Sequence, residues 1–188
     1  MGWWKGFTFL ELKEIYTKEI KQLQHELDYG YEGKWTYIRY CYFSVIYTQL
    51  MNGCRISEAV EAVTKYYNDG IRKQKVMVRK QRKNKKYIDI LIPKIVYRHY
   101  LGHIENIKDN PHRISYWMYH YWVNKYGVEN NTHTNRHCAI THMIDKMNVN
   151  PLTIKEITGH SNIDIITSYY HTEQALATKK KLLGDEDE

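Results

Sequence analysis

The sequence lacks the features that mark membrane-spanning, secreted and disordered proteins. No apolar run approaches the length of a membrane span, and Met1 to Phe7 do not have the basic-then-apolar layout of a signal peptide. Three scattered cysteines are too few for a disulfide framework, which favours a reducing compartment. Because 43% of the residues are hydrophobic, the composition is not that of a disordered chain. We therefore expect a cytoplasmic, folded protein that makes no membrane contact.

Prolines and repeats are also scarce. The 188 residues include three prolines, no internal repeat and no low-complexity segment. This length is typical of one domain and is sufficient to bury a core. We expect a single domain over residues 1–172, followed by a C-terminal helix and acidic tail over residues 173–188, whose last four residues are Asp or Glu.

Acidic residues are absent from one basic segment in the middle of the chain. The net charge is +7, and residues 71–86 contain nine Lys or Arg and no Asp or Glu. A charge run is often only a solvated surface. This run has a single sign and includes strand-like sequence, so we interpret it as facing phosphates, with nucleic acid favoured over an acidic membrane surface. The candidate DNA-binding residues are Lys80, Arg82, Lys85 and Lys86.

The spacing of apolar residues predicts a mainly helical protein with one exception. The segments 75–79 and 87–92 are rich in β-branched and aromatic residues, and a polar link joins them. This pattern predicts an antiparallel hairpin, although the link lacks glycine. The fold class is therefore mainly α with a small antiparallel β-sheet (α+β). The predicted helices cover residues 9–27, 36–51, 57–67, 93–107, 111–126, 134–147, 152–158 and 173–183.

Two of these helices have faces that bear on function. The helix from Thr134 carries an apolar stripe, and its first turn brings Asn135 and Arg136 beside His133. The aromatic stretch 116–122 could stack on nucleic-acid bases, but the four-residue spacing of its members is more typical of a core-facing stripe, and Trp117 and Tyr121 are the expected core residues. The apolar stripe of the helix from Thr134 consists of Ala139, Ile140, Met143, Ile144 and Met147.

The residues that carry chemistry suit the cutting of a phosphodiester by a side-chain nucleophile. Such a reaction needs a nucleophile, donors for the negative charge of the phosphorane, and an acid for the leaving oxygen. Arg55 and Arg136 are candidate phosphate clamps, because a guanidinium grips two oxygens and stays charged. Both are predicted at helix starts, where free amides also favour anions. His133 lies close enough to share a phosphate, and the glycine before His160 permits close approach.

These residues occur in an order that resembles the tyrosine recombinase (phage integrase) family, whose catalytic core is shared with type IB topoisomerases. Gly53–Ala59 is similar to the first family box, which holds an arginine and a supporting acid. His133–His137 matches the His-x-x-Arg box. Ile157–Asn162 is similar to the closing Gly-His box, and the nucleophile follows that histidine by nine residues, which selects Tyr169 over its neighbour. The resemblance spans residues 52–172.

The resemblance implies the following roles. Tyr169 attacks the scissile phosphate to form a 3′-phosphotyrosine, and His160 orients or accepts a proton near it. A hairpin lysine protonates the 5′ oxygen; Lys83 is our choice, with Lys85 as the alternative. No metal, ATP or other cofactor is implied. The phosphorane is stabilised by Arg55, His133 and Arg136, with Glu58 in a supporting role.

The resemblance also implies partners and contains departures. Double-stranded DNA is the expected partner, with self-association on DNA from dimer to tetramer and residues 173–188 as a possible docking segment. No separate N-terminal DNA-clamping domain is expected, since only about fifty residues precede Arg55. Asn135 and Thr158 replace large apolar family residues, and Cys54 also replaces an apolar one. None of these changes removes a reacting group.

Other interpretations of the same residues remain open. The chain has eighteen tyrosines and ten histidines, so each single Tyr or His is weak evidence. His133 and His137 could be metal ligands on one helix face, but no His-Glu-x-x-His arrangement accompanies them. For the function, the favoured hypothesis is a site-specific integrase or resolvase. The alternatives are a catalytically inactive DNA-binding relative and a type IB-like DNA-relaxing topoisomerase.

Overall fold

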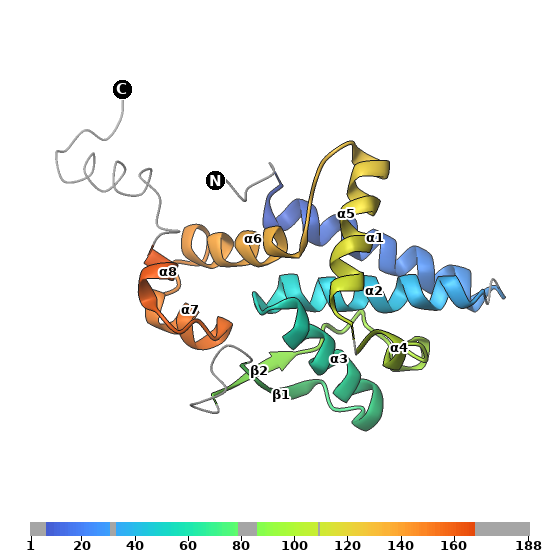
Figure 1. The fold of residues 1–188 in the computed structure, drawn as a ribbon, viewed down its shortest axis with the longest axis horizontal. Coiled ribbons are helices and arrows are strands. Elements are labelled where there is room, and N and C mark those ends of the chain that lie inside the picture. The colour runs from blue at the N-terminus through green and yellow to red at the C-terminus, as the bar shows by residue number, and fades with distance from the viewer. Residues whose placement is uncertain (1–6, 31–32, 79–85, 109, 168–188) are drawn as a thin grey trace.

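The computed structural model describes residues 7–30, 33–78, 86–108 and 110–167. Within them the protein is mainly helical and has a small two-stranded antiparallel sheet (Figure 1), which confirms the predicted fold class. The elements are α1 (Phe9–Asp28), α2 (Lys34–Asn52), α3 (Ile56–Asp69), β1 (Lys73–Met77), β2 (Tyr87–Leu91), the 3-10 helix η2 (Arg98–Tyr100), α4 (Glu105–Lys108), α5 (His112–Tyr126), α6 (Thr132–Asp145), α7 (Pro151–Thr158) and α8 (Ile163–Thr167).

Helix α1 has a clear start signal and one buried face. The Thr8 hydroxyl accepts a hydrogen bond from the Glu11 amide at 3.3 Å, and the Glu11 carboxylate accepts one from the Thr8 amide at 2.7 Å. This reciprocal pair satisfies two amides that a helix start otherwise leaves free. The buried face packs on α2 and consists of Leu12, Tyr16, Glu19, Ile20, Leu23 and Leu27.

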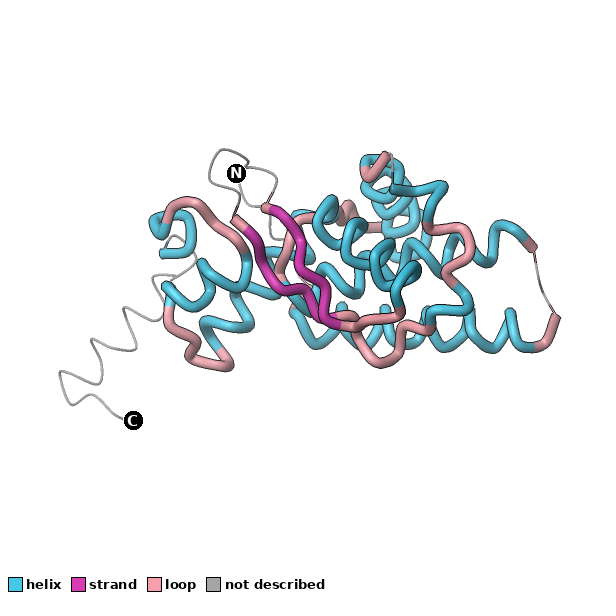
Figure 2. Tube along the Cα trace, turned by 90° about the horizontal axis from the view of Figure 1, so that it is seen from below, coloured by secondary structure: helices cyan, strands magenta, loops and turns pink. Residues whose placement is uncertain are grey.

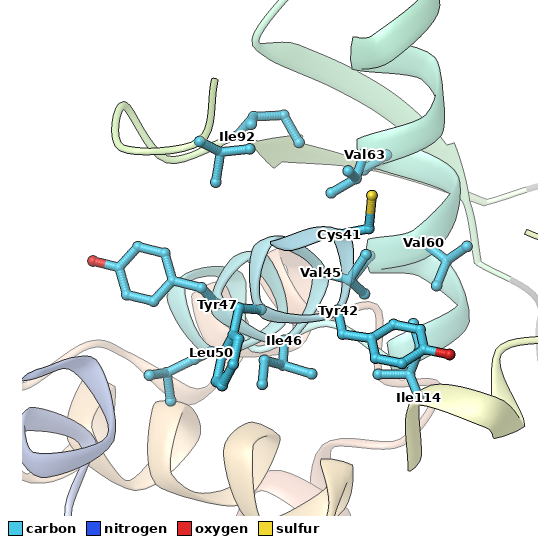
Figure 3. Close-up of a cluster of buried hydrophobic side chains, with 14 of the residues drawn as sticks. Cys41, Tyr42, Val45, Ile46, Tyr47, Leu50, Val60, Val63, Ile92 and Ile114 are labelled. Atoms are coloured by element: carbon cyan, nitrogen blue, oxygen red, sulfur yellow. The ribbon is translucent and has the colours of Figure 1, made fainter. Parts of the chain in front are cut away.

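Helix α2 forms the centre of the core. Every residue from Tyr40 to Leu50 is buried, as expected for a helix that other elements surround. Figure 3 shows its side chains leaving in several directions, with Cys41 close to Val63 of α3. The helix ends at Gly53, whose φ of 60° is a left-handed conformation that glycine adopts without strain.

The predicted hairpin is present, and its register is regular from Lys73 opposite Leu91 to Met77 opposite Tyr87. The pair lies across the underside of the helices (Figure 2). Asn52 attaches β2 to the end of α2, because its side chain donates to the Leu91 carbonyl and accepts from the Leu91 amide, each at 2.9 Å. The link at residues 79–85 lies outside the described residues.

The helix predicted over residues 93–107 is wrong. The segment instead forms turns, the 3-10 helix η2 and the four-residue α4. Arg72 is the physical reason, because its guanidinium donates to the carbonyls of Pro93 at 2.7 Å and Val96 at 3.2 Å. The Gln24 side chain occupies the Ile95 carbonyl at 2.7 Å. Carbonyls that a helix would pair with its own later amides are thus taken by distant side chains.

The other described helices lie within two residues of their predicted bounds, and the last third of the chain adds three differences. Helix α6 begins at Thr132, so Arg136 lies in its second turn rather than its first. The helix ends at Asp145, which leaves Met147 beyond it and 60% exposed rather than buried. Helix α8 was not predicted. The remaining members of the α6 stripe pack with Ile154 of α7 and Ile166 of α8 in a small second core.

The helix predicted over residues 173–183 lies outside the described residues.

The aromatic stretch of α5 follows the core prediction only in part. Trp122 is fully buried, whereas Trp117 and Tyr121 are half-buried and pack on the edge of the core.

Candidate active site

The turn between α2 and α3 holds Arg55 in a fixed orientation. Arg55 is the N-cap residue of α3, and its amide donates to the Glu58 carboxylate at 2.8 Å. The same carboxylate accepts from the Arg55 guanidinium at 3.0 Å. Glu58 is fully buried while Arg55 is partly exposed, so the acid braces the arginine from within. The supporting role of Glu58 in catalysis stays a prediction.

Gly53 allows this turn to pack tightly against the other half of the site. A Cβ built at Gly53 would lie 3.1 Å from Met143 of α6 and 3.1 Å from Thr158 of α7. A side chain here would force both neighbours to shift by a few tenths of an ångström, and the φ of 60° would strain it. The first box is thereby held beside the second and third.

Helix α6 presents His133 and Arg136 from its N-terminal half. The Asn131 side chain caps the helix by accepting from the amides of His133 at 2.8 Å and Thr134 at 3.4 Å. His133 is exposed, and Arg136 is buried with 7% of its surface accessible. Residues three apart lie on the same side of a helix, so the two side chains can approach one phosphate.

Asn135 fills a buried polar position behind the site. Its side-chain oxygen accepts from the Tyr16 hydroxyl of α1 at 2.7 Å, and its amide nitrogen donates to the Gln49 side chain of α2 at 3.4 Å. A large apolar residue would leave both partners without these bonds. The departure from the family pattern is thus matched by polar groups on two other helices.

His160 lies directly against Arg136. The Arg136 Nη2 atom is 2.7 Å from His160 Nε2, and it also donates to the Thr158 carbonyl at 3.2 Å. His160 follows Gly159, which ends α7 with a φ of 67°. A Cβ at Gly159 would come within 2.8 Å of Val78, so the Gly-His turn also packs on the base of the hairpin.

His160 is neutral at physiological pH in this environment. Burial, together with the positive charges of Arg136 and Arg55, lowers its pKa to about 3. Both candidate clamps therefore act electrostatically on one ring, and Arg136 also contacts it directly. A neutral imidazole can accept a hydrogen bond from an arginine, which a protonated one cannot.

The cysteines do not provide a competing nucleophile. All three are buried, and burial raises the pKa of both Cys41 and Cys138 to about 12. Burial likewise raises the pKa of Cys54, which lies next to Arg55. Thiols with such pKa values are protonated at neutral pH and react poorly.

Of the five hairpin residues predicted to bind DNA or to donate the proton, only Lys86 lies in the described part. It is partly exposed at the start of β2, and its ammonium is 3.0 Å from the Glu156 carboxylate of α7. The other four lie outside the described residues: Lys80, Arg82, Lys83 and Lys85. Tyr169 also lies outside them, two residues beyond the end of α8 at Thr167.

Neither a metal centre nor a membrane span is found in the described ranges. No group of three or more His, Cys, Asp or Glu side chains is arranged there to hold a metal ion. No helix among the same residues is both long and apolar enough to cross a bilayer.

Comparison with known proteins gives two sequence relatives. No protein-family model matches the chain. "Putative integrase ORF241" of the Acidianus two-tailed virus is 29% identical over 182 residues, which cover 96% of this chain and 68% of that protein. The order of the three boxes and this relative support a tyrosine recombinase catalytic domain. An uncharacterized protein of Methanocaldococcus jannaschii is 25% identical over 217 aligned positions, covering 99% of this chain and 91% of that protein.

A solved structure also aligns with this chain. It is the crystal structure of the XerH site-specific recombinase bound to difH substrate in a pre-cleavage complex. The TM-score is 0.47 and the identity 14%, with 86% of this chain and 50% of that chain covered. The present chain thus spans half the length of that recombinase.

The structure brings three predicted site residues near one another and adds two. Arg136 contacts His160, and Arg55 is near enough to lower the pKa of the same ring, although the three come from the α2–α3 turn, α6 and the end of α7. The roles of Asn135 and Thr158 as partners of the site were missed from sequence. The available signal was the polar character of both residues at positions where the family has large apolar ones.

Proposed function

We propose that the chain is a site-specific DNA recombinase of the integrase or resolvase type. It cuts double-stranded DNA through a 3′-phosphotyrosine and rejoins it without a metal or ATP. The observation that carries this proposal is that Arg136 contacts the neutral ring of His160 while Arg55 acts electrostatically on the same ring. Two guanidinium groups near one another can form a cradle for a phosphate.

The first step of the proposed reaction exchanges one phosphate ester for another. The Tyr169 hydroxyl gives up its proton to solvent, and its oxygen attacks the scissile phosphorus as the bond to the 5′ oxygen breaks. Arg55 and Arg136 balance the added charge of the phosphorane, and His133 contributes a further donor. Lys83 supplies the proton that converts the leaving 5′ oxygen into a hydroxyl.

The second step reverses the first with a different strand. A 5′ hydroxyl attacks the phosphotyrosine, and the tyrosine oxygen leaves. The number of phosphate esters is unchanged, so the exchange needs no external source of energy. His160 holds Arg136 in place through both steps because the ring accepts from Nη2 at 2.7 Å.

The proposed partners are duplex DNA and further copies of the chain. The basic hairpin would contact phosphates. Lys86 pairs with Glu156 in the absence of DNA, and a DNA phosphate would replace this carboxylate as its partner. Affinity should then fall steeply with salt, because bound counterions are released. We also propose assembly from dimer to tetramer on DNA, with residues 173–188 docking between protomers.

The covalent intermediate provides the decisive experiment. A nicked suicide substrate from the genomic attachment region of this chain would trap an adduct on a denaturing gel. We expect the adduct to vanish in Tyr169→Phe and to persist in Tyr170→Phe, which alters the adjacent residue. Arg136→Lys should lower adduct formation by about 100-fold or more, because a lysine lacks the fork that grips two oxygens.

Each outcome of that experiment has a defined meaning. An adduct that survives in Tyr169→Phe contradicts the assignment of the nucleophile. Salt-sensitive binding without any adduct in the wild type would indicate the inactive DNA-binding relative. Relaxation of any supercoiled plasmid without recombinant product would indicate the topoisomerase. A substrate whose leaving oxygen is replaced by sulfur needs no acid, so it should rescue Lys83→Ala but not Arg136→Lys.

A further inference from the structure

Thr158 forms a short hydrogen-bonded chain with His160. Its side chain is fully buried at the end of α7, where its hydroxyl is 2.6 Å from the Ile154 carbonyl and 2.5 Å from His160 Nδ1. A hydroxyl has one proton, and a carbonyl oxygen only accepts. The proton therefore points to Ile154. The Thr158 oxygen then accepts from His160, and Nδ1 must carry the hydrogen.

The other side of the ring leads to the same tautomer. Arg136 Nη2 is 2.7 Å from His160 Nε2, and a guanidinium only donates. Nε2 must therefore be without a proton. The same Nη2 is also 3.1 Å from Nδ1, so it lies near both ring nitrogens, and the shorter distance favours Nε2 as its acceptor. Thr158 thus selects the Nδ1–H form, and the Arg136 contact is compatible with it.

We propose that Thr158 is a positioning residue that fixes His160 as the Nδ1–H tautomer and thereby orients Arg136. The catalytic consequence rests on the proposed function and deepens it. With Nδ1–H bound to Thr158, Nε2 remains an acceptor, and the guanidinium lies against the ring, 2.7 Å from Nε2 and 3.1 Å from Nδ1. The Thr158 carbonyl accepts from the same Nη2 at 3.2 Å, so one residue holds the pair from both sides.

This arrangement assigns His160 a specific role. It acts as an acceptor for Arg136 and not as the acid that protonates the leaving oxygen. An apolar residue at position 158 could not accept from Nδ1, and the ring would then favour the Nε2–H form. That form presents a hydrogen to a guanidinium that also donates, so Arg136 would lose its orientation.

The tautomer can be measured without any assay of activity. Histidine labelled with nitrogen-15 gives distinct NMR signals for protonated and unprotonated ring nitrogens, and His160→Gln identifies the signals of this residue. At pH 7 we expect Nδ1 protonated and Nε2 unprotonated in the wild type. A wild-type Nε2–H form or a doubly protonated ring would overturn the proposal.

Two substitutions separate the hydroxyl from the packing at position 158. Thr158→Val keeps the shape and removes the acceptor, so we expect the tautomer to change and adduct formation to fall about tenfold or more. Thr158→Ser keeps the hydroxyl and should restore both. Thermal unfolding of each variant checks that it is folded.

The outcomes distinguish this proposal from the proposed function. If Thr158→Val keeps the wild-type tautomer and adduct rate, the positioning role is refuted. If the wild type has the Nδ1–H form and loses it in Thr158→Val, yet gives no adduct on any DNA, the assignment of Thr158 is supported and the recombinase function fails. Lack of rescue by Thr158→Ser, in a folded variant, would also contradict the role of the hydroxyl.

Discussion

At the residue scale, the site depends on an imidazole that stays neutral between two arginines. Burial holds the pKa of His160 at about 3, well below its ordinary value of 6.5. Protonation would place a third positive charge beside Arg136 and Arg55 and would remove the acceptor for Arg136. The buried acid Glu58 pairs with Arg55 and not with the ring, so it does not relieve this conflict.

The low pKa predicts how stability depends on pH. The unfolded chain binds a proton at His160 below about pH 6.5, whereas the folded chain does so only near pH 3. The contribution of His160 is therefore complete above pH 6.5 and is lost as the pH falls toward 3. Between pH 8 and pH 5, the wild type should lose about 2 kcal/mol more unfolding free energy than His160→Gln, measured by urea denaturation. Equal losses in both proteins would contradict the neutral ring.

At the element scale, the segment after β2 is shaped by a side chain rather than by its own sequence. Arg72 lies just before β1, yet its guanidinium binds carbonyls on both sides of Lys94. These bonds hold residues 92–96 as a loop beside α2, where the Tyr40 hydroxyl accepts from the Tyr97 amide at 2.8 Å. Local periodicity contains no information about such a partner, which is why a helix was predicted here.

Removing the guanidinium should destabilise the protein more than removing a neighbouring charge. Arg72→Met leaves several carbonyls without their donors, and we expect a loss of about 2 kcal/mol in unfolding free energy. Lys73→Met is the matched control. Its ion pair with Asp89 is exposed, so its loss should cost about 0.5 kcal/mol or less. Urea denaturation of both variants tests this difference, and equal effects would rule out the bracing role of Arg72.

At the scale of the whole molecule, the site is attached to the N-terminal helices through a buried polar link. Tyr16 of α1 and Asn135 of α6 are 119 positions apart in sequence and 2.7 Å apart in space. Both side chains are fully buried, so their hydrogen bond gives each of these polar groups a partner away from water. This link ties α6, which carries His133 and Arg136, to the main core.

A double-mutant cycle measures the coupling between the two helices. Asn135→Leu restores the apolar type usual in the family but strands the Tyr16 hydroxyl, which should cost about 1–3 kcal/mol. Tyr16→Phe should cost about 1 kcal/mol. Once both polar groups are gone, the double variant should be less destabilised than the sum of the two by at least about 0.5 kcal/mol. Strict additivity in denaturant unfolding would indicate that the bond contributes nothing.

Much of the fold was predictable because its signals are local. The apolar spacing of α1 and the alternation of Val76, Ile88 and Ile90 in the hairpin reflect burial on one face, and the elements form where predicted. The prediction that Met147 is buried was wrong for a local reason too. Helix α6 ends before this residue, and Asn148 adopts a φ of 49°. The spacing from His160 to Tyr169 remains a prediction, because Tyr169 lies outside the described residues.

The sequence by itself determined the helical class of the protein, the hairpin, and the order of the boxes that contain Arg55, Arg136 and His160. These follow from residue type and spacing along the chain. Only the tertiary structure decided that Thr158 binds His160, that Asn135 binds Tyr16, and that Arg72 prevents a helix after Pro93. The physical reason is that a buried polar group must find a partner, and these partners come from how the turns and helices pack together, which residue spacing along the chain does not specify.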